Sequence, residues 1–325
     1  MLNYSFRTEI QEQKAEYTVS HQNSILLMGS CFAENMGEKL TKCKFDTLSN
    51  PFGILFNPVS IAQSLDLLTH SILFQESDLH FFANEWISFL HHGKFSHPDK
   101  EKCLSTINEK LSEGRAFLQK ADFLILTLGT TVSYKYQGVV VANCHKVPQK
   151  EFQKQMLTSK DIVLVLTNSI EKVRSINENI RIIFTVSPVR YIKNSMVENA
   201  FSKAQLIVAT HELLRQIPNS DYFPAYEIMM DDLRDYRFYG DDMIHPSPLA
   251  VNYIWDIFCN TFFSEETSKL NTQIDEILTA KNHRLRNPSS EESRCFKEEQ
   301  LKKIQKIQSY SPHIQFDEEI AYFEN

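Results

Sequence analysis

Two neighbouring residues near the start of the chain could act as a nucleophile. Ser30 and Cys31 follow Gly29, which comes directly after the short apolar run SILLM. A strand, a tight turn at Gly29 and a helix starting near Phe32 would place both side chains at a helix N-terminus, which favours an anion. Such a position lowers the pKa of a thiol and supplies donors for an oxyanion. The alternative is that Ser30 only caps the helix and Cys31 is a small core residue.

A carboxylate and an imidazole stand three residues apart much later in the chain. Asp242 precedes His245 at a spacing that lets the carboxylate accept the Nδ1–H of the imidazole. That bond fixes the tautomer and leaves Nε2 facing a nucleophile, as in a catalytic triad. The alternative is structural: Ser247 and Pro248 are typical of the start of a helix over 249–263, where an acidic residue is stabilising by itself.

Four further polar residues could contact a substrate. Asn143, His145 and Lys146 lie in an aromatic and β-branched stretch, and either reach the same site or form a solvated hairpin end. Arg190 lies just past a short apolar run, where it could hold an anionic group or form an ion pair.

The sequence gives no support for a metal or a cofactor. His91, His92 and His97 are close together, but no Cys or second carboxylate stands at the spacing of metal ligands. The glycine-rich dinucleotide and phosphate-binding motifs, the G-x-S-x-G elbow and the H-E-x-x-H motif are all absent from the sequence. We therefore expect neither a bound metal nor a cofactor.

An alternation of strands and helices would position these residues. Short apolar runs typical of buried strands occupy 24–28, 123–128, 181–186 and 222–229. Helical patterns occupy 32–42, 59–70, 103–120, 158–177 and 199–216. This order predicts an α/β fold with a doubly wound parallel sheet.

The positions of the scarce glycines point to one edge of that sheet. Only 8 of the 325 residues are glycine, well below the usual ~7%. Ligands bind such sheets at the carboxyl ends of the strands. Half of the glycines fall at predicted strand ends or in loops and could frame one site: Gly29, Gly53, Gly129 and Gly240.

Two stretches interrupt the alternation, and the composition changes after residue 263. Residues 81–95 and 131–147 are aromatic and β-branched, which predicts hairpins that form a small cap beside the main sheet. Residues 264–325 are charged and helix-favouring, with a break at Asn287–Pro288. We expect a first domain over 1–263 and a helical C-terminal extension that folds back or mediates self-association.

Composition limits the partners and the location. The chain has 34 Lys and Arg against 41 Asp and Glu, a net charge of −7, so neither nucleic acid nor a membrane surface is an expected partner. No apolar run reaches the ~18 residues of a membrane-spanning helix. The first residues do not resemble a secretory signal, and the six cysteines form no C-x-x-C pair. We expect reduced thiols and a cytoplasmic protein.

Taken together, these motifs resemble the GSCFA-domain family, which lies within the SGNH (GDSL-type) hydrolase superfamily. Gly29-Ser30-Cys31-Phe32-Ala33 is the motif that names the family. Further stretches that resemble it are Asn50-Pro51-Phe52-Gly53, Thr127-Leu128-Gly129-Thr130, Asn143-Cys144-His145-Lys146, Ser187-Pro188-Val189-Arg190 and the run at 222–227. The resemblance covers residues 20 to 262 and implies a flavodoxin-like sheet of the SGNH type.

The resemblance also implies acyl-ester hydrolysis or acyl transfer through a covalent acyl-enzyme. Aligning the superfamily's G-D-S motif places Cys31 at the nucleophile position, and a shift of one residue places Ser30 there. Asp242 and His245 match the superfamily's D-x-x-H in spacing. The implied substrate is a small-molecule or saccharide acyl ester, such as an O-acetyl ester.

The implied oxyanion site departs from the superfamily pattern. Gly53 matches a glycine whose backbone N–H binds the oxyanion, and Asn50 beside it is expected to bind substrate. Gly129, Thr130 and Thr131 occupy the place of G-x-N, with Thr131 where the Asn should be. A hydroxyl is a poorer donor than a carboxamide, and losing one oxyanion donor costs ~10²–10³ in rate.

This departure keeps a second function open. The chain could be a non-catalytic binding module that uses the crevice to hold an acylated sugar or peptide. The missing Asn favours the binding module, whereas the spacing of Asp242 and His245 favours the enzyme.

Overall fold

The main domain is built around one parallel sheet of five strands. The computed structural model describes residues 8–10, 14–193, 195–283, 287 and 290–324. The strands are β1 (Ser24–Gly29), β2 (Asp46–Ser49), β5 (Phe123–Leu128), β9 (Arg181–Val186) and β10 (Ser220–Phe223). Their spatial order, β10-β9-β5-β1-β2 with every pair parallel, is the flavodoxin-like order 2-1-3-4-5 read from the other side. The predicted doubly wound α/β fold is confirmed.

Helices cover both faces of this sheet, which explains why the central strands are apolar throughout. Alternate residues of a strand point to opposite faces. Leu26 and Met28 of β1 pack with α2 to α5, and Ile25 and Leu27 pack with α1 and α7. The helices are α1 (Cys31–Lys42), α2 (Pro58–Thr69), α3 (Lys100–Lys120), α4 (Ser159–Ile176), α5 (Met196–Gln216) and α7 (Pro248–Phe262).

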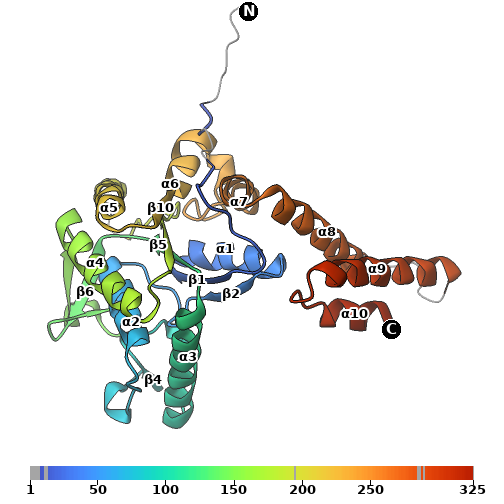
Figure 1. Ribbon diagram of the computed structural model, residues 1–325. Helices are drawn as coiled ribbons and strands as arrows, with labels where there is room; N and C mark the ends of the chain where they lie inside the picture. Colours follow the sequence, from blue (N-terminus) through green and yellow to red (C-terminus); the bar gives the residue numbers. More distant parts are fainter. Residues whose placement is uncertain (1–7, 11–13, 194, 284–286, 288–289, 325) are drawn as a thin grey trace, which may run out of the picture.

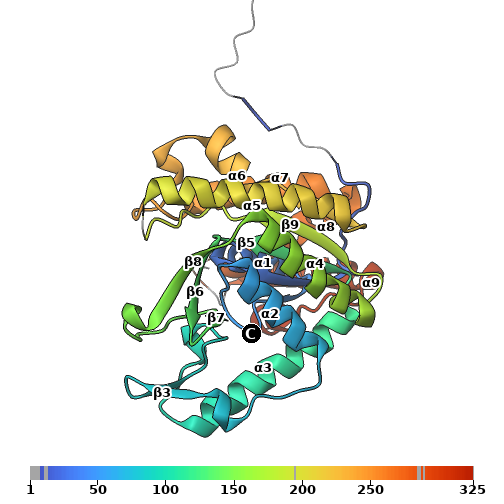
Figure 2. The same cartoon turned by 90° about the vertical axis from the view of Figure 1, so that its left-hand side faces the viewer.

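Both expected hairpins are present and form a cap on one side of the sheet (Figure 2). The first pairs β3 (His80–Phe82) with β4 (Glu85–Ile87), and the second is part of a three-stranded sheet of β6 (Val132–Tyr136), β7 (Val139–Val141) and β8 (Phe152–Met156). Ile87 and Phe89 share an apolar cluster with Val132, Tyr134 and Val141, which joins the two hairpins. β8 was not predicted.

The prediction of one strand over 222–229 was wrong. β10 ends at Phe223, because Pro224 has no N–H to continue the ladder. The chain then forms a helical turn, α6 (Ala225–Glu227), and a π-helical turn, η4 (Ile228–Leu233). The edge strand β2 was missed because its sequence DTLS is short and polar. The remaining short helices are η1 (Glu76–Asp78), η2 (Gly93–Phe95), η3 (Gln149–Glu151) and η5 (Tyr236–Phe238).

The C-terminal extension is helical and projects beyond the β2 side of the main domain (Figure 1). It consists of α8 (Glu265–Asn282), α9 (Glu291–Tyr310) and α10 (Asp317–Glu324), which share an apolar cluster of their own. The ammonium of Lys44 lies 2.7 Å from the carboxylate of Glu319 and 5.4 Å from the ring of Phe316, which ties the extension to the main domain. α10 was not predicted, and Pro288 lies outside the described residues.

We expect Gly29→Ala to destabilise the protein strongly. Gly29 has φ +137°, and a Cβ there would lie 2.1 Å from the carbonyl oxygen of Thr127, so we expect the free energy of unfolding to fall by about 3 kcal/mol or more. Gly93→Ala is the matched control, because a Cβ at Gly93 meets no atom within 4 Å. Urea denaturation measures both, and equal stabilities would contradict the prediction.

Candidate functional site

The turn after β1 presents a capping hydroxyl and a thiol. The N–H of Ser30 donates to the carbonyl of Thr127 at 3.1 Å, and its Oγ accepts the N–H of Phe32 at 3.3 Å. Ser30 is therefore the N-cap of α1, and it is only 2% exposed. Cys31 is the first residue of the helix, and its free thiol is partly exposed. Of the two side chains, Cys31 is the more accessible one.

The electrostatics of Cys31 differ from the expectation. Burial raises the pKa of the Cys31 thiol above its ordinary value, and the carboxylate of Glu34 adds to the rise. Hydrogen bonds from the amides of Cys31 and Phe32 and the positive charge of Lys203 act in the opposite direction. The predicted lowering by the helix N-terminus is thus wrong as a net effect, because the loss of solvation outweighs it.

Asp242 and His245 form the predicted pair. Nδ1 of His245 lies 2.6 Å from Oδ2 of Asp242, whose Oδ1 also accepts the N–H groups of Ile244 and His245 at 2.9 and 3.0 Å. These hydrogen bonds, that of the His245 side chain above all, lower the pKa of Asp242 to about 2. The side chains are 47% and 53% exposed, and Nε2 of His245 has no hydrogen-bond partner in the described part of the chain.

Arg190 fastens the loop that carries this pair. Its backbone N–H donates to the carbonyl of Ile244 at 3.2 Å, and its Nη1 donates to that of Met243 at 3.1 Å. The guanidinium also lies 3.9 Å from the ring centroid of Tyr239. Within the described ranges Arg190 has no ion pair, so its visible role is to hold the loop against the end of β9.

The Gly129–Thr131 loop has its backbone donors occupied. The N–H groups of Gly129 and Thr130 both donate to the carbonyl of Phe56, at 3.0 and 2.9 Å, and that of Thr131 donates to Oγ of Ser202 at 2.8 Å. Oγ of Ser202 also lies 3.1 Å from Oγ1 of Thr130. Oγ1 of Thr131 is buried and has no partner among the described residues. In this conformation the three amides cannot serve an oxyanion as well.

Asn50 holds an unpaired donor beside the β1–α1 turn. Its Oδ1 accepts the N–H of Gly29 at 2.8 Å, which fixes the orientation of the carboxamide. Nδ2 is buried and has no partner in the described part of the chain. Gly53 is in a different situation, because its N–H already donates to the Asn50 carbonyl at 2.7 Å.

The other residues that were expected to contact a substrate, Asn143, His145 and Lys146, lie in the cap. Nε2 and Nδ1 of His145 lie 2.9 Å from the carbonyl of Ser88 and 3.5 Å from Oγ of Ser96. Oδ1 of Asn143 accepts the N–H of His145 at 2.6 Å. Lys146 is exposed. His145 and Asn143 thus stabilise the cap itself, and no group of three metal-ligating side chains occurs among the described residues.

Sequence reasoning missed Lys203 of α5. It is 1% exposed, and its Nζ donates to the carbonyls of Gly129 and Ser187 at 2.7 Å each. These carbonyls follow β5 and β9, so Nζ lies at the carboxyl edge of the sheet. The helical periodicity of the sequence could have indicated its burial. Lys203 stands three residues before Leu206 and ten before Leu213, which places all three on the buried face of the helix.

The structure therefore brings the predicted residues to one edge without closing a triad. Cys31 and Asn50 follow β1 and β2, and Arg190 connects the loop of His245 to the end of β9. No hydrogen bond among those of the described residues joins Cys31 to His245. Catalytic hydrogen bonds are often long before substrate binds, so both residues stay candidates.

Comparison with models of known protein families identifies the family of this chain. A model of the GSCFA family matches residues 24–258, which include Cys31, Asn50, Asp242 and His245. The chain belongs to the GSCFA family. A second model, described as the C-terminal domain of GSCFA domain proteins, matches residues 274–325. A search of curated proteins finds no match.

Several solved structures are distantly similar to this GSCFA chain. A family 3 carbohydrate esterase from Talaromyces cellulolyticus has 11% identity over 78% of this chain and 99% of its own, with a TM-score of 0.38. An acetyl esterase variant with an acetate ion has 10% identity over 78% and 99%, with a TM-score of 0.37. A family 3 carbohydrate esterase from Clostridium thermocellum has 11% identity over 77% and 98%, with a TM-score of 0.32. Because these identities and TM-scores are low, the chemistry of the site has to be argued from the residues of this chain itself.

We expect the Asp242 carboxyl to titrate at about pH 2 and to return toward its ordinary pKa in His245→Ala. A depressed pKa means that the stabilising contact is complete above pH 4 and is lost as the pH falls toward 2. Carboxyl ¹³C NMR measures the titration. The control is Asp161, whose pKa is lowered by its own hydrogen bonds with Thr158 and should not respond. An Asp242 titration that is the same in both proteins would contradict the assignment.

Proposed function

We propose that this chain hydrolyses or transfers the acyl group of an ester, with Cys31 as nucleophile, His245 as base and then acid, and Asp242 as the group that orients His245. The observation that carries the proposal is the 2.6 Å contact between Asp242 and His245. It occupies Nδ1 and leaves Nε2 without a hydrogen-bond partner among the described residues. The loop that carries His245 is bound to the carboxyl edge of the sheet, the edge where Cys31 begins α1.

Cys31 is a better candidate for the nucleophile than Ser30. The Ser30 oxygen accepts the N–H of Phe32 and is needed to cap α1. Cys31 is half-buried whereas Ser30 is buried, and backbone hydrogen bonds from Cys31 and Phe32 act to lower the pKa of the Cys31 thiol. Although burial raises the pKa of this thiol, a positioned imidazole can remove its proton.

The proposed reaction runs through a thioester. Nε2 of His245 takes the proton of Cys31 Sγ, and the sulfur attacks the ester carbonyl, forming a C–S bond and an oxyanion. Collapse breaks the C–O bond to the leaving alcohol, which takes its proton from His245. Water or an acceptor hydroxyl then attacks the thioester carbonyl and gives its proton to His245. Collapse breaks the C–S bond and releases the acid or the new ester, and His245 returns the proton to the Cys31 sulfur.

The carboxamide of Asn50 is the proposed side-chain donor to the oxyanion. Its Nδ2 is a buried N–H donor without an acceptor among the described residues, and a buried unpaired donor costs free energy unless a ligand supplies its partner. The bond from Gly29 to Oδ1 fixes the direction of Nδ2 before substrate arrives. This donor would replace the Asn that is absent at Thr131.

A second function, non-catalytic binding of an acylated sugar or peptide, has one observation in its favour. The amides of Gly129, Thr130 and Thr131 are all paired inside the protein. A loop built in this way can shape a pocket without stabilising an oxyanion. In a binding module, His245→Ala would leave ligand affinity unchanged.

We propose that the GSCFA domain ends at residue 263 and that residues 264–325, which follow it in the chain, form a separate unit. Their helices share an apolar cluster that includes Ile274, Ile304 and Phe316. Self-association through this unit and a cytoplasmic location stay predictions. Among the described residues, no helix has both the length and the apolar character needed to cross a bilayer.

We expect a covalent acyl adduct on Cys31. Intact-mass spectrometry after incubation with p-nitrophenyl acetate should show one added acetyl group in the native protein and in Ser30→Ala, but none in Cys31→Ala or His245→Ala. Ser30→Ala should lose about 1 kcal/mol of stability, because the helix loses its cap. Absence of adduct and of ester turnover in folded native protein would favour the binding module, and an adduct lost only in Ser30→Ala would move the nucleophile to Ser30.

We expect Asn50→Asp to slow acylation by ~10²–10³, the cost of removing one oxyanion donor. The substitution keeps an acceptor for the Gly29 N–H and tolerates the positive φ of 47° at this position. Asn108→Asp on α3 is the control: Asn108 also accepts a backbone N–H, that of Phe74 at 2.8 Å, but its Nδ2 donates to the Phe74 carbonyl at 3.0 Å and it does not touch the β1–α1 turn. This variant therefore loses stability without a loss in the rate of acylation. Stopped-flow acylation and thermal denaturation are measured together. An unchanged rate in folded Asn50→Asp would rule out the donor role.

A further inference from the structure

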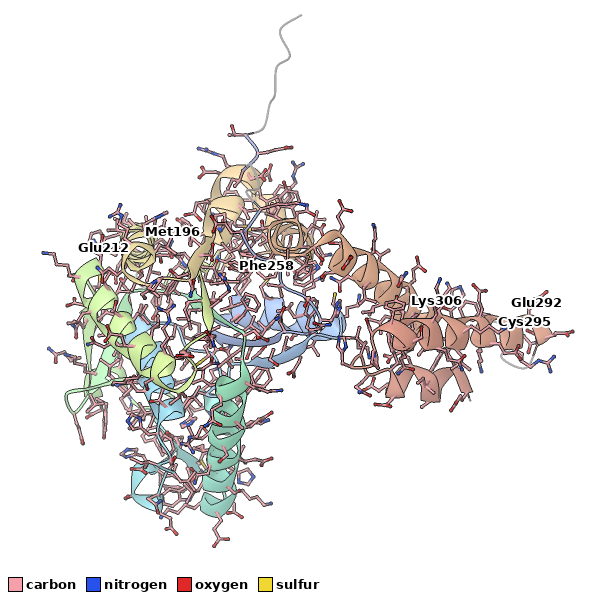
Figure 3. All side chains as sticks on the ribbon, in the orientation of Figure 1. Met196, Glu212, Phe258, Glu292, Cys295 and Lys306 are labelled. Atoms are coloured by element: carbon pink, nitrogen blue, oxygen red, sulfur yellow. The ribbon has the colours of Figure 1, made fainter. Side chains whose placement is uncertain are left out.

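A buried lysine bonds two loops beside the candidate site and has no role in the reaction proposed above. Lys203 belongs to α5, the helix that carries Met196 and Glu212 in Figure 3. Nζ of Lys203 bridges the loops after β5 and β9 by donating to the carbonyls of Gly129 and Ser187, each at 2.7 Å.

The number of acceptors around Nζ matches a neutral amine. An ammonium has three N–H donors and an amine has two. Two backbone carbonyls accept from Lys203, and no third acceptor occurs among the described residues. The amine is therefore satisfied as it stands, whereas the ammonium would keep one buried N–H without a partner.

The charges near Lys203 are few. The described residues contain no carboxylate within ion-pair distance of it, and the ring of Tyr226 lies 5.7 Å from Nζ. Burial lowers the pKa of Lys203 to about 7, and a Cys31 thiolate opposes that change. Glu34 acts on the thiol from α1 with the opposite sign to Lys203. The geometry places Lys203 beside the turn that carries Cys31: Nζ donates to the carbonyl of Gly129, and a Cβ at Gly129 would lie 3.4 Å from the Cβ of Ser30, the residue before Cys31. Negative charge at Cys31 is thus a counter-charge that this site can form.

We propose that Lys203 is a positioning residue for Cys31: its amine holds the loops after β5 and β9 together, and its protonated form stabilises the Cys31 thiolate. The inference rests on the proposed function in that it takes Cys31 as the nucleophile. Lys203 makes no bond to substrate.

Proton gain at Lys203 and proton loss at Cys31 favour each other. In the reaction the proton of Sγ still goes to His245, and Lys203 exchanges its own proton with solvent. When negative charge forms at Cys31, the ammonium gains the counter-charge that the resting site lacks. Such coupling is reciprocal, so it must be visible from either residue.

The first test measures the reactivity of the Cys31 thiol. Iodoacetamide alkylates the thiolate, so its rate against pH reports the thiol pKa, and peptide mass spectrometry resolves each cysteine. Lys203→Gln keeps N–H donors for the two carbonyls but has no charge, and we expect alkylation of Cys31 at pH 7.5 to fall about tenfold, one pKa unit. Cys295, exposed on α9 (Figure 3), is the internal control and should react equally in both proteins.

Lys203→Met separates the two parts of the role. It removes the donors as well as the charge, so we expect a lower Tm than for Lys203→Gln, with a similar loss of Cys31 reactivity. A Cys31 profile in folded Lys203→Gln or Lys203→Met that matches the native protein would overturn the proposal and leave Lys203 a structural residue.

The second test needs no change at Lys203. In Cys31→Asp a carboxylate carries negative charge at this position at neutral pH, so the ¹³Cε signal of Lys203 should titrate at a higher pH than in the native protein. Equal midpoints would also overturn the proposal.

Neither test depends on turnover. If both effects occur and no acyl adduct forms on Cys31, the proposed function fails and the Cys31–Lys203 coupling stands. If the adduct forms and neither effect occurs, only the role of Lys203 fails.

Discussion

A close approach between the turn after β1 and the carbonyl of Thr127 on β5 determines where the site residues lie. A Cβ at Gly29 would be 2.1 Å from that oxygen, and the N–H of Ser30 donates to the same oxygen at 3.1 Å. This contact sets the direction in which α1 leaves the sheet. The cap at Ser30, the thiol of Cys31 and the carboxamide of Asn50, which accepts the Gly29 N–H, all depend on it.

The candidate site combines two electrostatic environments at one edge of the sheet. Asp242 and His245 are about half exposed, so water screens their charges and their pairing comes from the loop that Arg190 restrains. Lys203 is buried and Cys31 is half-buried, and charges in such surroundings interact strongly but are costly to form. The exposed pair is in direct contact with solvent, whereas the charge of Lys203 depends mainly on the charge that forms at the thiol.

The sequence predicted features that depend on neighbouring residues and missed those that depend on distant ones. The strands over 123–128 and 181–186 were correct because both of their faces are buried, and Asp242 and His245 pair because they are three residues apart. The donor of Asn50 is fixed by a residue 21 positions away, and Lys203 bonds a carbonyl 74 positions away. Such contacts exist only once the sheet has formed, and a lysine on an amphipathic helix is usually on the surface.

The two edge strands of the sheet are shorter than its central strands. The edge strands β2 and β10 have four residues each, whereas β1, β5 and β9 have six. β10 is followed by Pro224, which offers no N–H, and the C-terminal helices are bound at Lys44, just before β2 begins. Exposed edges are where separate molecules add strands to one another and aggregate. Short, obstructed edges of this kind leave little unpaired backbone on which a strand of another molecule could add.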